Sequence, residues 1–229
     1  MKVGVVIPCL NEEGNVGSVI DGLLTAGADL VIVADNGSTD ATASVARDAG
    51  AVVVDEPRRG YGWACAAGTA KALDEDCDIV AYIDGDQSSL PSELPHLIDP
   101  IRSDTAELVL GSRTLGTVQA GAMPPHQKFG NRLTAAVMRR LYGVEVTDLG
   151  PYRAITAELV RALAMSEMTF GWPTEMMVKA ANRNARMIEV PATWERRGEG
   201  NSKVSGTIKG SALAAWHILR VTWLHRPTR

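Results

Sequence analysis

The chain has 229 residues, of which 45% are apolar and 22% are charged, and its net charge is −4. This composition is typical of a globular protein with a buried core, and the length suits one α/β domain, with two small domains as the alternative. The negative net charge gives no electrostatic case for nucleic-acid binding, so we expect no nucleic-acid partner. No uncharged apolar stretch reaches 18 residues, so no transmembrane helix is expected.

The N-terminus is a short strand-like run followed by polar Asn11-Glu12-Glu13, which is not the pattern of a signal peptide. The cysteines are far apart and odd in number, with neither metal spacing nor a disulfide framework: Cys9, Cys65 and Cys77. This usage favours a reducing compartment. We therefore expect a cytoplasmic protein, with peripheral contact to the inner face of the membrane as a further option.

In the first half of the chain, short apolar runs alternate with helical patterns, which predicts a doubly wound, mostly parallel α/β sheet with helices on both faces. Strands are expected at residues 3–7, 30–34 and 51–54 and from residue 79. Helices are expected at residues 16–24, 41–49 and 63–73. Asn11 is expected to cap the first helix, and Ser38 or Thr39 the second.

The second half is predicted to contain further helices and strands and two long polar or glycine-rich loops. Helices are expected at residues 92–101, 127–142, 157–164 and 173–183, and strands at 108–110 and 187–191. Residues 146–155 mix strand and turn patterns, and residues 114–125 and 196–203 are expected to be loops. Without an internal repeat or a linker, we expect one domain over residues 1–229.

The run from Ile79 is a buried-strand pattern that leads directly into Asp84-Gly85-Asp86. A strand that ends in this way delivers two carboxylates to the carboxyl edge of a sheet, where ligands bind in open α/β folds. Two carboxylates suit a hard divalent cation, Mg²⁺ or Mn²⁺, which would usually hold a phosphate or diphosphate as well. The alternative is an ordinary Asp/Gly turn after a strand.

Polar clusters follow three of the expected strands, and they would converge on one pocket if those strands were neighbours. Their spacing resembles that of family-2 glycosyltransferases with the GT-A fold. The matching residues are Pro8-Cys-Leu-Asn11-Glu12, Asp35-Asn-Gly-Ser38-Thr-Asp40, Asp84-Gly-Asp86, Gly111-Ser112-Arg113 and Asp148-Leu-Gly-Pro-Tyr-Arg153. A last element, Arg197-Gly-Glu-Gly200-Asn-Ser202-Lys203, is similar to the Arg-x-x-Gly-x-Ser-Lys motif of the dolichyl-phosphate mannose synthase group.

The resemblance implies a half that binds a nucleotide sugar and metal, at about residues 1–112, and an acceptor half at about 113–229. It implies a metal held by Asp84 and Asp86 on the donor diphosphate, and inversion at the sugar carbon C1. Pro8 and Glu12 would line the nucleoside site, and Asp35 would contact the base or ribose. The donor-binding residues so implied are Pro8, Asn11, Glu12, Asp35, Gly37, Ser38, Asp84 and Gly85.

The acceptor decides whether the reaction needs a base. A hydroxyl acceptor needs a carboxylate to take its proton, whereas a polyprenyl phosphate is already ionised and needs only positive charge. The residues expected at the acceptor phosphate are Arg113, Lys128, Arg132, Arg153, Ser202 and Lys203. Glu175 lies where relatives place an acidic residue and would be the base for a hydroxyl acceptor. The residues expected to act in catalysis are Asp86, Arg113, Glu175, Arg197 and Lys203.

The sequence departs from the family pattern in three ways: Asn36 replaces a common aspartate, Ser88 replaces a glutamine, and the appended membrane-spanning helices of many relatives are missing. Transfer to a polyprenyl phosphate is the first interpretation, and transfer to a soluble hydroxyl acceptor is the second. A sugar-phosphate nucleotidyltransferase is disfavoured because no glycine-rich basic loop follows the first strand. An inactive nucleotide-sugar-binding subunit is disfavoured by the intact Asp84, Asp86, Arg197 and Lys203.

The C-terminal segment, residues 208–224, is apolar almost all round and is followed by basic residues. Three interpretations stay open: a core helix, an interfacial membrane helix with tryptophans at headgroup level, or a subunit contact in a homodimer.

Overall fold

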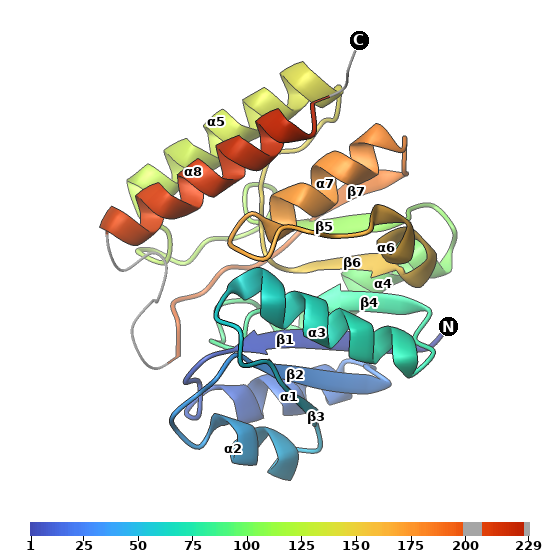
Figure 1. Cartoon of the computed structure of the whole chain (residues 1–229), viewed down its shortest axis with the longest axis vertical. Helices are drawn as coiled ribbons and strands as arrows, with labels where there is room; N and C mark the ends of the chain where they lie inside the picture. Colours follow the sequence, from blue (N-terminus) through green and yellow to red (C-terminus); the bar gives the residue numbers. More distant parts are fainter. Residues whose placement is uncertain (199–207, 227–229) are drawn as a thin grey trace.

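The computed structural model describes residues 1–198 and 208–226, with the backbone only at 125–129 and 208–215. Within these residues, seven strands form one sheet in the order β3-β2-β1-β4-β6-β5-β7 (Figure 1). The strands are β1 (Val3–Cys9), β2 (Leu30–Asp35), β3 (Val52–Asp55), β4 (Ile79–Tyr82), β5 (Leu108–Ser112), β6 (Arg153–Thr156) and β7 (Met187–Pro191). All neighbours are parallel except β6, which runs antiparallel to β4 and β5.

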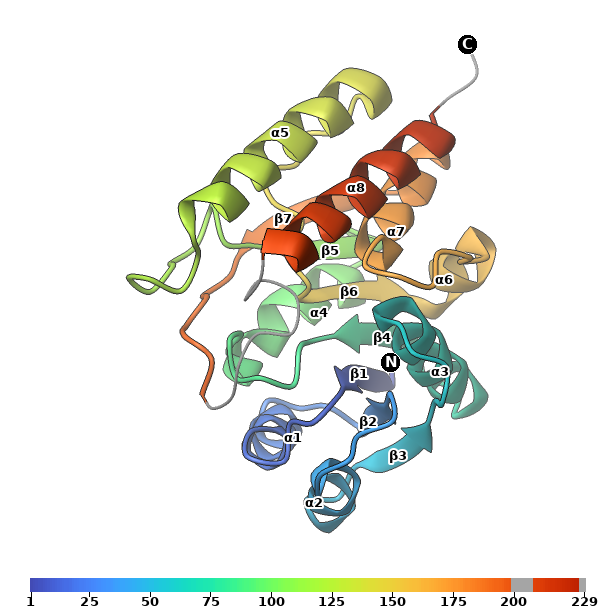
Figure 2. The same ribbon diagram turned by 60° about the vertical axis from the view of Figure 1, so that its left-hand side comes forward.

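Helices cover both faces of the sheet (Figure 2). They are α1 (Val16–Thr25), α2 (Thr42–Asp48), α3 (Tyr61–Asp74), the short 3-10 helix η1 (Pro91–Glu93), α4 (Leu94–Arg102), α5 (Pro125–Tyr142), α6 (Ala157–Leu163), α7 (Trp172–Asn182) and α8 (Ile208–Leu224). No helix in the described ranges is long and apolar enough to cross a membrane.

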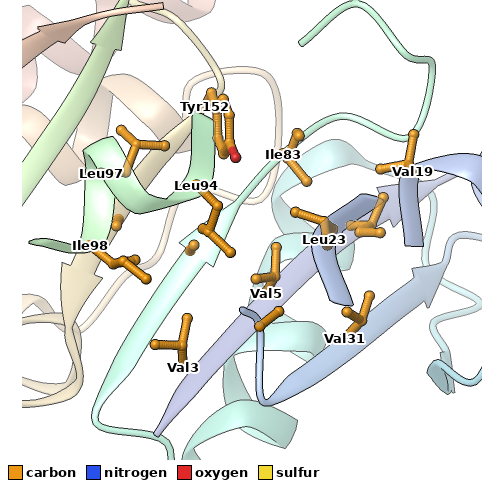
Figure 3. Packing of buried hydrophobic residues seen from close by; sticks show 14 of the residues in the cluster. Val3, Val5, Val19, Leu23, Val31, Ile83, Leu94, Leu97, Ile98 and Tyr152 are labelled. Carbon is orange, nitrogen blue, oxygen red and sulfur yellow. The ribbon is translucent and has the colours of Figure 1, made fainter. Parts of the chain in front are cut away.

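One core lies between the sheet and helices α1, α2 and α4. Figure 3 shows Val5 and Val31 of the sheet facing Leu23 of α1 and Leu94 of α4, all of them buried. The alternate residues of the same strands, such as Val6 and Ile32, belong to the opposite core under α3, α6 and α7. Burial on both faces explains why these strands are continuous apolar runs rather than alternating ones.

Helices α5 and α8 lie side by side over α7, away from the sheet (Figures 1 and 2). Met138 of α5 and Val221 of α8 are buried in the core that they share with α7. The Tyr142 hydroxyl donates to the backbone carbonyl of Thr222, which ties the end of α5 to α8. These two helices therefore form an outer layer on one face of the molecule.

The predicted sheet class and most predicted elements are confirmed, with shifts of a few residues at their ends. The predicted helix caps are wrong. Helix α1 begins at Val16, after Asn15, and Asn11 instead adopts a left-handed backbone with φ of 53°. Helix α2 begins after Ala41 with no side-chain cap. The short antiparallel β6 occupies part of the stretch whose strand and turn patterns were mixed.

Candidate functional site

The carboxyl ends of β1, β2 and β4 surround a cavity of about 300 Å³. Since β1 pairs with β2 on one side and with β4 on the other, the polar clusters that follow these strands come together as expected. The walls come from six segments that are separated in the sequence. The lining residues include Pro8, Leu10, Glu12, Asn36, Arg59, Tyr61, Asp84, Gly85, Asp86, Phe170, Trp194 and Arg197.

Asp84 and Asp86 lie side by side at the base of this cavity. Asp86 is only 5% exposed, and its Oδ1 accepts hydrogen bonds from the Ser88 backbone N–H and hydroxyl at 2.9 and 2.5 Å. The Tyr61 hydroxyl donates to Asp84 Oδ1 at 3.3 Å. Burial, together with the negative charge of Asp86, raises the pKa of Asp84 to about 7. The pair is a concentrated negative charge that favours a cationic partner.

Gly85 allows the two carboxylates to sit tightly against the first strand. A Cβ at position 85 would come within 2.8 Å of Cys9 Sγ and 3.1 Å of Ile7 Cγ2. Such contacts are shorter than side chains tolerate, so the turn is pressed directly onto the end of β1. The spacing of two aspartates around a glycine is thus a packing requirement as well as a chemical one.

Arg197 provides a cation to this carboxylate pair. Its Nη2 lies 2.5 Å from Asp86 Oδ2, and its Nη1 donates to Glu12 Oε1 at 3.0 Å. The backbone N–H of Gly198 also donates to the Asp86 carbonyl at 3.1 Å. Arg197 therefore links Glu12, which follows β1, to Asp86, which follows β4.

Asp35, Gly37 and Ser38, at the end of β2, support the cavity from outside its lining. Asp35 Oδ1 accepts from the backbone N–H of Ser38 at 3.1 Å and from its hydroxyl. Ser38 Oγ in turn accepts from the Asn11 backbone N–H at 2.8 Å, and Asn11 Oδ1 accepts from the Thr39 backbone N–H at 2.8 Å. Gly37, with φ of 79°, makes the turn possible. Asn11 thus fixes one loop against the next.

Asn36 has a role that the sequence analysis did not assign. Its side-chain amide donates to the carbonyls of Glu56 and Arg58 at 3.0 and 2.7 Å, and its Oδ1 accepts from the Gly60 N–H at 2.9 Å. An aspartate could not donate to two carbonyls, which explains the departure from the family pattern. Asn36 thereby holds the loop that presents Arg59 and Tyr61 to the cavity.

Phe170 and Trp194 also line the cavity and were not anticipated, because no local motif marks them. Tyr61 and Arg59 follow a visible pattern, since two arginines and two glycines cluster at residues 58–62. That cluster identified a loop but not the sheet edge it faces.

A second, smaller cavity of about 190 Å³ is lined by residues 113–132 and includes Arg113, Asn131 and Arg132. Arg113 makes a two-pronged ion pair with Asp148, with Nε and Nη2 each 2.7 Å from a carboxylate oxygen. Asn131 donates to the same carboxylate at 2.6 Å. The Arg113 guanidinium also lies 4.8 Å from the centre of the Trp194 ring, which faces the first cavity. Trp194 and Arg113 thus connect the two cavities.

Two of the expected site residues are directed into the interior. Arg153 is 1% exposed, and its guanidinium donates to the carbonyls of Pro173 and Gly150 at 2.8 and 2.5 Å. The structure does not bring it to a surface that a phosphate can reach, so its expected acceptor role needs correction. Such an arginine braces the backbone beneath the site.

The expected role of Glu175 as a base also needs correction. Its carboxylate is fully buried and accepts from the Ser166 N–H and hydroxyl, from the Glu167 N–H at 2.8 Å and from Lys179 Nζ at 2.8 Å. Burial alone would raise its pKa, but these hydrogen bonds outweigh burial and lower the pKa. Glu175 therefore holds the loop that carries Phe170 and is not positioned as a base.

The remaining expectations concern residues that the structure does not describe in full. Lys128 lies in the first part of α5, at residues 125–129, where only the backbone is described. Ser202 and Lys203 lie outside the described residues. Their expected roles at the acceptor phosphate remain predictions.

The mostly parallel sheet, with an Asp-Gly-Asp turn at the end of β4 over the site, defines a glycosyltransferase of the GT-A fold. The chain belongs to glycosyl transferase family 2, whose profile matches residues 4–163. The resemblance drawn from the sequence motifs is confirmed at this level.

Relatives named as sugar-transferring enzymes match nearly the whole chain. An uncharacterized glycosyltransferase of Mycobacterium tuberculosis is 37% identical over 96% of this chain and 97% of its own length. The undecaprenyl-phosphate mannosyltransferase of Micrococcus luteus is 31% identical over 93% of this chain and 91% of its own. The dolichyl-phosphate hexose transferase of Haloferax volcanii is 32% identical over 92% of this chain and 90% of its own.

Solved structures support the fold. Glucosyl-3-phosphoglycerate synthase of Mycobacterium tuberculosis, crystallised with Mn²⁺, uridine diphosphate and glucosyl-3-phosphoglycerate, matches with a TM-score of 0.78. The match covers 99% of this chain and 81% of that one, at 23% sequence identity. At this identity the likeness concerns the fold alone.

Proposed function

We propose that the chain transfers a hexose from a nucleoside-diphosphate sugar to a polyprenyl phosphate, in a reaction that depends on Mg²⁺ or Mn²⁺. The observation that carries this proposal is the pair of cationic side chains, Arg113 and Arg132, in the second cavity, connected through Trp194 to the carboxylate pair in the first. Two relatives named for polyprenyl-phosphate acceptors match nearly the whole chain.

The donor set suits a hard cation. Asp84 and Asp86 offer carboxylate oxygens, and the pKa of Asp84 is raised first by burial and then by the charge of Asp86. A divalent cation would offset both effects. Among the described residues, no cluster of three or more His, Cys, Asp and Glu side chains surrounds the pair, so a bound cation would take its other ligands from diphosphate oxygens and water. When bound, it would offset negative charge on the leaving diphosphate.

The protein's own residues would hold the donor from two sides. Tyr61 and Arg59 are presented to the nucleotide side of the cavity by the loop that Asn36 fixes. Arg197 places its positive charge beside Asp86, where charge would develop on the diphosphate as the sugar leaves. Phe170 and Trp194 add aromatic surface to the cavity wall, which would help to exclude water when the donor is bound.

The transfer is a displacement at C1 of the sugar. A phosphate oxygen of the acceptor forms a bond to C1, the bond from C1 to the diphosphate oxygen breaks, and the nucleoside diphosphate leaves with that electron pair. A single displacement inverts the configuration at C1. An ionised phosphate has no proton to lose, so no base is required, which agrees with Glu175 being engaged in the loop at residues 166–167.

A soluble acceptor is the competing outcome, and one experiment separates the two. The protein is incubated with Mg²⁺ or Mn²⁺, labelled nucleotide sugars and a short-chain polyprenyl phosphate, and label is counted in the organic phase. Label that appears there and is lost on chelation supports the proposal. Donor turnover with label only in the aqueous phase would overturn the proposal of a lipid acceptor. Transfer that does not depend on metal would overturn the proposal of a divalent cation. Family membership itself disfavours the nucleotidyltransferase alternative.

A further inference from the structure

Helices α5 and α8 lie side by side on the outer face of the molecule (Figure 1). An apolar groove between them is open to solvent. A shallow cavity of about 760 Å³ runs between them, with Val137 and Leu141 on one side and Trp216, Leu219 and Trp223 on the other. Trp216 is 57% exposed and Trp223 is 63% exposed. Most of the large exposed apolar side chains in the described residues lie on these two helices: Leu133, Trp216, Leu219, Trp223 and Leu224. We refer to this set, with the arginines around it, as the α5–α8 surface.

The α5–α8 surface is basic, although the chain as a whole is acidic. Neither helix contains an aspartate or a glutamate, whereas the chain has 27 acidic and 23 basic residues. Arg140 and Arg220 line the groove, and Arg132, Arg139 and Arg226 are exposed elsewhere on these helices or just after α8. Positive charge is therefore concentrated where the apolar side chains are exposed.

The tryptophans and arginines are arranged together. The Arg226 guanidinium lies 4.1 Å from the centre of the Trp223 ring, and that of Arg220 lies 5.8 Å from the centre of the Trp216 ring. Indole rings prefer the boundary between headgroups and acyl chains, and arginines beside them meet anionic headgroups. Arg220 is also paired with Glu167 at 3.2 Å, so among the described residues of this surface the remaining positive charge comes mainly from Arg139, Arg140 and Arg226.

We propose that the α5–α8 surface docks the protein on an anionic lipid bilayer, with Trp216 and Trp223 at headgroup level. A second copy of the chain fits less well. A two-fold interface would place the same arginines opposite each other, and their repulsion would oppose association. A bilayer that contains anionic lipid satisfies both the apolar groove and the charge.

The surface is continuous with the acceptor side of the site. Helix α5 also carries Asn131 and Arg132, which line the second cavity. Helix α8 is tied to the loop of Phe170, because His217 Nδ1 lies 3.0 Å from the Thr169 hydroxyl. Docking would therefore hold the second cavity close to lipid headgroups. The docking surface stands on its own evidence, and only this link to the acceptor rests on the proposed function.

Vesicle co-sedimentation of the full chain tests the proposal. The wild type is expected to bind phosphatidylcholine vesicles that contain phosphatidylglycerol, to bind pure phosphatidylcholine much less, and to be released by raised salt. The double variants Trp216→Ser/Trp223→Ser and Arg139→Glu/Arg140→Glu should each weaken binding by about tenfold or more. Their side chains are exposed, so the fold should survive, and circular dichroism checks this.

Matched controls come from other faces. Arg47→Glu/Arg161→Glu changes the net charge equally, and Leu24→Ser/Leu115→Ser removes exposed apolar side chains elsewhere. These controls should bind as the wild type does. Absence of wild-type binding, equal binding to both vesicle types, or equal loss in the controls would overturn the proposal. So would a dimer in light scattering that depends on Trp216 and Trp223.

Transfer measured with a water-soluble, short-chain polyprenyl phosphate and no vesicles separates this proposal from the proposed function. The two docking variants should retain that activity. If the wild type bound vesicles but transferred no sugar to the phosphate, the proposed function would fail while the docking surface stood. Transfer without vesicle binding would reverse that conclusion.

Discussion

Arg197 and Asp86 form a short ion pair, 2.5 Å between Nη2 and Oδ2, at the position where a divalent cation would be bound. The same guanidinium is held by Glu12. The protein therefore neutralises its own carboxylate pair with a side chain, and a bound cation would compete with that side chain. This competition can be measured directly.

We expect Arg197→Ala to bind Mn²⁺ more tightly than the wild type when no donor is present, because the competing cation has been removed. Transfer should nevertheless fall on the order of 10²–10³-fold, because a charge that stabilises the leaving diphosphate is lost. Free Mn²⁺ measured by electron paramagnetic resonance gives the affinity. The exposed Arg196→Ala is the neighbouring control, and weaker Mn²⁺ binding in Arg197→Ala would contradict the competition.

Asp86→Ala should abolish metal-dependent donor binding and turnover. Removing Asp86 leaves Arg197 paired with Glu12, so the variant should still fold. Donor titration by calorimetry, with and without EDTA, measures the effect, and Asp99→Ala on the exposed side of α4 is the control. Normal turnover of the wild type in EDTA would show that the reaction does not need a divalent metal.

Glu175→Gln distinguishes a structural role from a base. We expect the free energy of unfolding to fall by about 1–3 kcal/mol, because charge-assisted hydrogen bonds to Ser166, Glu167 and Lys179 are weakened. Activity per folded molecule should stay near that of the wild type. A variant with unchanged stability and no activity would instead support Glu175 as the catalytic base.

The loss of stability in Glu175→Gln should depend on pH, and the direction of the pKa shift gives its sign. Hydrogen bonds lower the pKa of Glu175 in the folded chain despite its burial. Its contribution to stability is therefore present above its unfolded pKa, roughly 4.3, and is lost as the pH falls through the folded value. The difference in unfolding free energy between the wild type and the variant should be largest near neutral pH and vanish in acid. Chemical denaturation across pH measures it.

Gly85→Ala should destabilise the site, because the new methyl group would meet Cys9 Sγ at 2.8 Å. Overpacking of this kind costs about 1–3 kcal/mol, and the displaced aspartates should also weaken donor binding. Adding Cys9→Ala should recover part of both losses. Gly130→Ala in α5, where a Cβ would meet no atom within 4 Å, should instead be neutral or stabilising. Equal effects at the two glycines would contradict the packing argument.

The sequence predicts the strands, most helices and the convergence of the carboxylates well, because apolar periodicity and strand-end motifs are local. The corrected residues depend on contacts between separate segments. Glu175 of α7 accepts from the loop at residues 166–167, which precedes that helix, and Arg153 of β6 donates to the carbonyls of Gly150 and Pro173. The residues next to Glu175 and Arg153 in the sequence do not distinguish a structural side chain from a catalytic one.

The same limit applies to residues that were missed. Asn36 differs from the family's aspartate by one amide, and its importance appears only when the Glu56 and Arg58 carbonyls lie beside it. Trp194 and Phe170 follow no motif, and their place in the cavity is set by β7 and by the loop before α7. Strand β6 is four residues long, too short for periodicity to identify its direction.

Strand β6 determines how the chain can be divided. It follows residue 112 in the sequence, yet it lies between β4 and β5, which both precede it, with Val80 opposite Ile155 and Val109 opposite Ala154. A fragment that ends at residue 112 would leave β5 without either of its neighbours, β6 and β7. Chimeras that exchange the segment after residue 112 between relatives must therefore preserve the β4–β6–β5 register, because the incoming β6 has to match strands that it did not evolve with.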